Sequence, residues 1–97
     1  REHVERPKPD PEPYRTALGM LKLKPYLCIA FEDSKKGLLS AKGAGLPCVV
    51  IRNPYNQDED LTEADLVAAS LKNITLSGFR RITRHTAARL SPWFFTF

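Results

Sequence analysis

The sequence predicts an α/β fold built on a parallel strand–helix–strand unit. Two apolar runs, residues 27–31 and 47–51, have strand length and no polar alternation, a pattern typical of strands that are covered on both faces. Between them, residues 35–44 are predicted to form a helix, with Ser34 as its cap and Gly45 as its end. Such a connection is almost always a right-handed crossover between two parallel strands.

Size and composition limit the fold to one small domain. The chain has 97 residues, of which 42% are hydrophobic and 27% are charged, values that are ordinary for globular proteins and exclude coiled coils and collagen-like chains. No apolar run approaches the roughly 18–20 residues that cross a bilayer. The first seven residues carry mixed charge and do not resemble a secretory signal, so we expect a cytoplasmic protein without a membrane span.

A helix is predicted before the first strand, over residues 11–23. Its apolar side chains recur at i, i+3, i+4 and i+7, the spacing of one helix face, and are Tyr14, Ala17, Leu18 and Leu21. Asp10 is placed to accept from the free N–H groups of the first turn, and Lys24-Pro25 is expected to end the helix.

Less regular sequence follows the second strand. Residues 55–61 form a polar, acidic loop, in which we interpret Asp58-Glu59-Asp60 as solvated. Residues 64–67 are predicted to form a short edge strand, and residues 70–74 a final helical turn. Cys28 and Cys48 lie inside the apolar runs and are predicted to be small buried hydrophobes, without a disulfide or a metal.

The basic excess is confined to the carboxy-terminal tail. Residues 1–74 contain eleven basic and eleven acidic side chains, whereas residues 75–97 contain four arginines and no acid, within a net charge of +4. Five of the nine aromatic residues also lie in this tail. We therefore predict a boundary near Thr75 that separates residues 1–74 from residues 75–97.

Two polar motifs are candidates for chemistry. Glu32 and Asp33 follow the first strand directly, at the end where open α/β sheets bind ligands, and such a pair suits Mg²⁺ or simply the start of a helix. Lys8 stands between two prolines that stiffen the backbone, so its ammonium suits a phosphate, an active-site carboxylate or only solvent.

Together the motifs resemble the haloacid dehalogenase superfamily of hydrolases, in its β-phosphoglucomutase and phosphatase-like branch. The resemblance rests on Lys8-Pro9-Asp10-Pro11, an amphipathic helix, and then Phe31-Glu32-Asp33-Ser34 with Gly37 and Ala44-Gly45. It extends over residues 6–74 and implies a Rossmann-like core of that superfamily.

The resemblance implies a role for each matching residue. Lys8 matches the catalytic lysine that neutralises the aspartyl nucleophile and the transferring phosphoryl group. Asp33 matches the aspartate that binds Mg²⁺, Glu32 the acidic neighbour that orients metal-bound water, and Ser34 the start of the helix behind the site. Phosphoryl transfer depends on positioned positive charge and metal, which agrees with these roles.

One departure from the family pattern is decisive. The family's Asp-x-Asp motif, whose first aspartate attacks phosphorus, does not precede Lys8. We therefore expect a partial core that lacks the first strand and the cap domain, the carboxy-terminal portion of a hydrolase or mutase acting on a small phosphorylated metabolite. This portion is expected to be inactive alone.

The tail supports a second hypothesis of a different class. Arg80, Arg81, Arg84 and Arg89, interleaved with aromatic residues, would make the chain a non-enzymatic interaction module that binds a polyanion or an anionic surface. A shifted reading frame and a disordered tail are the other interpretations, and we expect no nucleic-acid partner. His3 and His85 are interpreted as solvated, and residues 93–95 as exposed unless they pack on the sheet.

Overall fold

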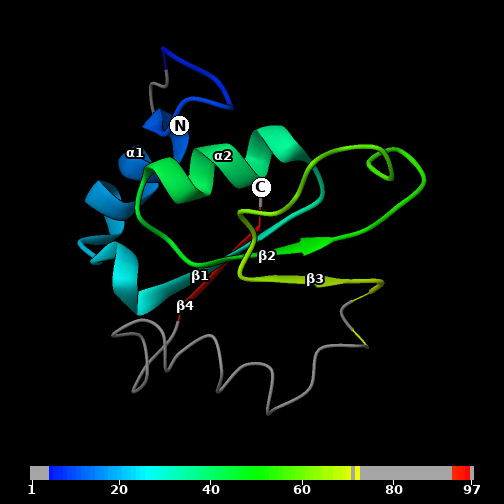
Figure 1. Cartoon of the computed structure of the whole chain (residues 1–97). Coiled ribbons are helices and arrows are strands. Elements are labelled where there is room, and N and C mark those ends of the chain that lie inside the picture. The colour runs from blue at the N-terminus through cyan, green and yellow to red at the C-terminus, as the bar shows by residue number, and fades with distance from the viewer. Residues whose placement is uncertain (1–4, 71, 73–92, 97) are drawn as a thin grey trace.

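The structure is a computed structural model that describes residues 5–70, 72 and 93–96. Along the chain its elements are α1 (Glu12–Leu21), the 3-10 turn η1 (Pro25–Leu27), β1 (Cys28–Glu32), α2 (Lys35–Gly43), β2 (Cys48–Ile51), β3 (Leu66–Ala68) and β4 (Trp93–Thr96). Both described α-helices lie on the same side of the sheet (Figure 1).

The sheet has the strand order β3-β2-β1-β4, and every neighbouring pair is parallel. Glu32 at the end of β1 is in register with Val50 of β2, so the two strands end at the same edge of the sheet. The predicted strand–helix–strand unit is therefore confirmed. The short strand expected over residues 64–67 is also present, shifted to Leu66–Ala68.

The α1 helix differs from its prediction mainly at its end. Its first residue, Glu12, donates its N–H to the Asp10 carboxylate at 2.9 Å, so Asp10 satisfies a first-turn donor as predicted. The helix ends at Leu21, because Lys22 adopts a left-handed backbone with φ 56°. The prediction that the helix continues to Leu23 and is ended by Lys24-Pro25 is wrong, since the left-handed residue stops it first.

The α2 helix begins at Lys35 as the sequence predicts and ends at Gly43, one residue before the predicted end. The Ser34 hydroxyl accepts from the Gly37 N–H at 3.1 Å, which makes Ser34 the cap. Gly45 has a φ of 88°, a left-handed conformation that turns the chain from α2 into β2. The cap fixes where α2 starts relative to the carboxyl end of β1.

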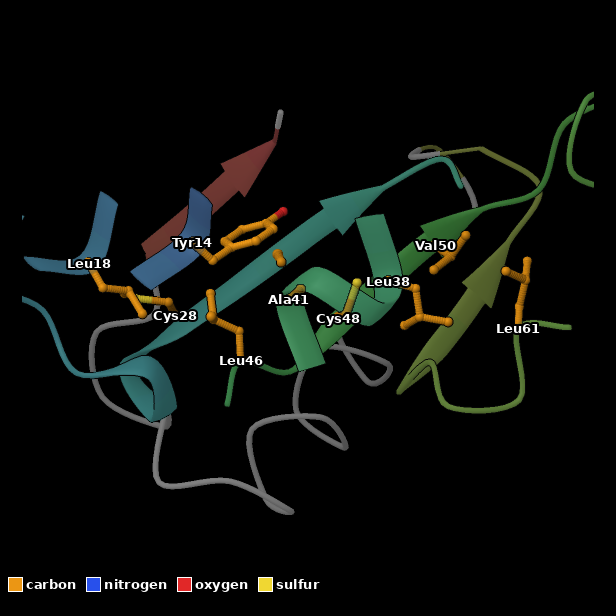
Figure 2. Close-up of a cluster of buried hydrophobic side chains, with 10 residues drawn as sticks. Tyr14, Leu18, Cys28, Leu38, Ala41, Leu46, Cys48, Val50 and Leu61 are labelled. Carbon is orange, nitrogen blue, oxygen red and sulfur yellow. The ribbon is translucent and has the colours of Figure 1, made fainter. Parts of the chain in front are cut away.

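The main core lies between the two helices and the sheet. Alternate residues of β1 and β2, namely Cys28, Ala30, Cys48 and Val50, face the helices. Figure 2 shows Tyr14 and Leu18 from α1, and Leu38 and Ala41 from α2, in this cluster. Cys28 and Cys48 are both free and buried, as predicted. Ile29 and Val49 belong to a second cluster on the opposite face.

Several predictions concern residues outside the described part of the chain. They are those on His3, on the tail arginines, on His85 and on most of the helical turn at 70–74. Residues 93–96 are described, and they form β4, which pairs with β1 in parallel (Figure 1). The predicted boundary near Thr75 remains a prediction, although β4 places four tail residues in the sheet. Within the described residues, no helix is both long enough and apolar enough to cross a bilayer.

Candidate functional site

The candidate site lies at the carboxyl end of β1, where strand alternation points Glu32 toward the helices. Glu32 is two residues after Ala30, so its side chain lies on the helix-covered face and is only 1% exposed. A carboxylate buried to this degree requires partners, because an unpaired buried charge is costly.

Lys8 and Tyr14 supply those partners. The Lys8 ammonium donates to both oxygens of Glu32, at 2.9 Å to Oε1 and 2.8 Å to Oε2. The Tyr14 hydroxyl donates to Oε2 of the same carboxylate. Lys8 Nζ also lies 5.8 Å from the centre of the Tyr14 ring. The structure thus brings two predicted site residues, Lys8 and Glu32, into direct contact, although 24 positions separate them in the sequence.

Tyr14 takes part in this cluster as a neutral donor. Burial is the main cause that raises the pKa of Tyr14 above its ordinary value, and the hydrogen bond and charge of Glu32 raise it further. The sequence predicted only, from helical spacing, that Tyr14 lies on the apolar face of a helix. Nothing in that spacing indicated that its hydroxyl binds Glu32.

Gly37 makes room for the Glu32 carboxylate at the start of α2. A Cβ at Gly37 would lie 1.9 Å from Glu32 Oε1 and 2.3 Å from its Cδ, well inside van der Waals contact. The absence of a side chain at Gly37 is therefore a condition for the Lys8–Glu32 pair. The sequence analysis included Gly37 in the motif that follows β1, but it did not predict that Glu32 occupies the space at this glycine.

Asp33 differs from Glu32 in being exposed. Its backbone carbonyl accepts from Asn56 Nδ2 at 2.8 Å and from Asn53 Nδ2 at 3.5 Å. The carboxylate therefore stands at the sheet edge on a backbone that is held by the loop after β2.

This loop makes hydrogen bonds that its polar sequence did not predict. Arg52 donates through Nη1 to three loop carbonyls, those of Asn56, Gln57 and Glu59, at 2.8 to 3.3 Å. The Glu59 carboxylate accepts from the Lys35 N–H at 3.0 Å. The prediction that Asp58-Glu59-Asp60 is wholly solvated is therefore wrong for Glu59, because this residue binds the amino end of α2, where a carboxylate is favourable. Asp58 and Asp60 are exposed as predicted.

The carboxylates at this edge of the sheet could supply part of a Mg²⁺ site. In the described residues no group of three or more His, Cys, Asp or Glu side chains could hold a metal. Mg²⁺ nevertheless accepts one or two carboxylates when waters and phosphate oxygens supply the rest. Exposed Asp33 offers one such carboxylate, whereas both oxygens of Glu32 already accept from Lys8.

Comparison with known proteins agrees with the geometry. Residues 1–51 match the haloacid dehalogenase-like hydrolases. The chain is 42% identical over 71 residues to validoxylamine A 7'-phosphate phosphatase of Streptomyces hygroscopicus subsp. limoneus, a match that covers 73% of this chain and 33% of that protein. It is 37% identical over 76 residues to hexitol phosphatase A of Escherichia coli strain K12, covering 78% and 35%.

A crystal structure supports the same assignment. CbbY from Rhodobacter sphaeroides in complex with phosphate superimposes with a TM-score of 0.74 at 40% identity, over 79% of this chain and 35% of that one. This chain spans between a fifth and about a third of the length of the curated relatives described above and of others with comparable matches. With a family match over residues 1–51, these structural and sequence similarities establish that the chain belongs to the haloacid dehalogenase-like hydrolases.

Proposed function

We propose that this chain is the carboxy-terminal portion of a Mg²⁺-dependent phosphatase or phosphomutase that acts on a small phosphorylated metabolite, such as a phosphorylated sugar or polyol. The main support is the contact between Lys8 and Glu32, 2.8 Å long, beside exposed Asp33 at the carboxyl end of β1. In open α/β sheets this end is where ligands bind. The names of a hexitol phosphatase and a validoxylamine phosphate phosphatase among the relatives support the substrate class.

Lys8 is the proposed catalytic residue of this portion. Its side chain is 23% exposed while its ammonium contacts Glu32, which leaves room for the proposed contact with an incoming phosphoryl group. Glu32 accepts from the ammonium through both oxygens and Tyr14 donates to the same carboxylate, so the positive charge is held before a substrate arrives. A positive charge positioned in advance is what a phosphoryl group requires in its transition state.

Asp33 is the proposed metal ligand. Glu32 is proposed to orient a water molecule bound to the metal, while its carboxylate also binds Lys8. When bound, Mg²⁺ would neutralise phosphoryl oxygens and help to orient the substrate. The nucleophilic aspartate is proposed to come from an Asp-x-Asp strand outside this chain.

The test uses the full-length protein that contains this chain. The intact mass of the protein from its native source establishes its full length. Release of inorganic phosphate from hexitol and sugar phosphates is measured with and without Mg²⁺. We expect Asp33→Asn and Lys8→Ala each to lower turnover by at least about 100-fold, while Asp58→Asn, at an exposed loop carboxylate, remains at the wild-type rate. Unchanged turnover and unchanged Mg²⁺ dependence in Asp33→Asn would contradict the assignment.

A further inference from the structure

Another buried polar side chain, Asn56, donates to the backbone of Asp33 and takes no part in the Lys8–Glu32 contact. It is 1% exposed although it sits in a polar loop. All its side-chain groups are used: Nδ2 donates to the carbonyls of Asp33 and Ile51 at 2.8 and 2.9 Å, and Oδ1 accepts from the Asn53 N–H at 2.8 Å. A buried amide with every group satisfied is a strong geometric constraint.

The two carbonyls that Asn56 binds belong to neighbouring strand ends. Ile51 is the last residue of β2, and Asp33 is the first residue after β1. The Asp33 carbonyl lies beyond its strand, where it has no partner in the sheet and needs another donor. Asn56 thus links the carboxyl ends of β1 and β2 at the edge where Asp33 is exposed.

The same loop holds the other side of the Asp33 turn. Glu59 accepts from the Lys35 N–H at 3.0 Å, two residues after Asp33. Arg52 in turn donates to the carbonyls of both Asn56 and Glu59, at 2.8 and 3.3 Å. The turn from Asp33 to Lys35 is therefore bound at both ends by one loop, and the Arg52 guanidinium binds the backbone of that loop.

We infer that Asn56 is a positioning residue for Asp33: it fixes the backbone that aims the Asp33 carboxylate at a divalent cation, and Glu59 supports it. The inference rests on the proposed function, since it assumes that Asp33 is a metal ligand. An exposed carboxylate must lose backbone and side-chain freedom when it binds a cation. A backbone held in advance reduces this loss, so the Asn56 amide increases affinity without touching the metal.

The test uses the ¹⁵N-labelled 97-residue chain and Mn²⁺ as a paramagnetic substitute for Mg²⁺. Two quantities are measured by NMR. The first is the backbone order parameters of residues 33–35, and the second is the Mn²⁺ concentration at which paramagnetic broadening halves the intensity of their amide signals. In the wild type, excess Mg²⁺ should reverse the broadening. We expect Asn56→Ala to lower the order parameters and to weaken Mn²⁺ binding about 10-fold, the lower end of the range for residues that orient metal ligands.

Three further variants separate positioning from stability. Leu46→Val removes one methylene group from a fully buried core position two residues before β2, and it should lower stability without changing order or Mn²⁺ binding at residues 33–35. Glu59→Ala removes the hydrogen bond between the loop and the Lys35 N–H, and Glu59 is only half-buried. This variant therefore tests the role of the loop if Asn56→Ala does not fold. Glu59→Gln keeps an acceptor for the Lys35 N–H and should retain wild-type order.

The outcomes distinguish this inference from the proposed function. Wild-type order and Mn²⁺ binding in folded Asn56→Ala, or in Glu59→Ala where only that variant folds, would overturn the role of the loop. Equal losses in Leu46→Val would also overturn it, because a general loss of stability would then explain the effect. If Mn²⁺ broadens no amide near Asp33 in the wild type, the metal role of Asp33 fails, and the order parameters alone decide whether Asn56 fixes the turn.

Discussion

At the scale of single residues, the site depends on how one buried carboxylate is neutralised. Glu32 has 1% of its side chain exposed, and Lys8 and Tyr14 both donate to it. Removing one partner of a buried ion pair costs about 3–5 kcal/mol, because the other charge is left uncompensated. Lys8 therefore stabilises the fold, in addition to its proposed catalytic role. The sequence predicted Lys8 and Glu32 as site residues, but their mutual contact depends on a tertiary arrangement that no local pattern specifies.

Cys48 allows a prediction about alkaline pH. Burial, with smaller effects from the charges of Glu32 and Asp65, raises the pKa of the Cys48 thiol from 9.0 to about 12. In the unfolded chain the thiol ionises near its ordinary pKa, whereas in the folded chain it stays protonated. Between these two values the folded state binds more protons, so the free energy of unfolding falls as pH rises, by up to about 1.4 kcal/mol per pH unit for this group.

Urea unfolding at a series of pH values between 8 and 11 checks this prediction. Below the ordinary thiol pKa the contribution of Cys48 is fully present, and it declines steadily above that pH. Cys48→Ala lowers stability at pH 8 because it leaves a small cavity. Its decline above pH 9 should be shallower than that of the wild type, so the difference between the two proteins narrows or reverses as pH rises. Parallel declines in the two proteins would show that Cys48 does not ionise on unfolding in this range.

At the scale of elements, α2 combines two functions at its first turn. Its cap, Ser34, follows Asp33 directly, and Gly37 leaves the space that Glu32 fills. The sequence predicted the cap and the start of this helix correctly, because capping is a local property. The loop over residues 53–59 was beyond such prediction, because Asn56 and Glu59 bind backbone groups more than 20 positions away.

Two glycine substitutions test the packing of α2 against Glu32. Gly37→Ala places a Cβ 1.9 Å from Glu32 Oε1, so we expect it to displace the carboxylate and to lower the free energy of unfolding by about 2–4 kcal/mol. Gly19→Ala is the matched control, because a Cβ there would meet no atom within 4 Å apart from its chain neighbours and the backbone of its own helix. The control should raise stability by up to about 1 kcal/mol through helix propensity. Urea unfolding measures both, and a neutral Gly37→Ala would show that Glu32 does not need the space.

At the scale of the whole molecule, the sheet is where expectation and structure differ most. The sequence predicted the strand–helix–strand unit from apolar runs at 27–31 and 47–51, and the edge strand near residue 66. It did not predict that residues 93–96 form a fourth strand beside β1, because their short aromatic run lies after a tail with a different composition. Strand pairing between residues more than 60 positions apart is a long-range choice that periodicity does not determine.

The pairing of β4 with β1 gives the last prediction. Trp93 to Thr96 are in register with Cys28 to Phe31, so β4 covers the edge of β1 that β2 leaves free. Replacing residues 93–96 by Gly-Ser-Gly-Ser keeps the chain length but removes strand propensity, and each lost ladder hydrogen bond should lower the free energy of unfolding by about 1 kcal/mol. The uncovered edge of β1 would then offer unpaired N–H and C=O groups to a second molecule. We therefore expect a lower urea midpoint together with concentration-dependent dimers in size-exclusion chromatography. A monomer with the wild-type midpoint would mean that β4 contributes nothing to the sheet in solution, and that the edge of β1 is protected in another way.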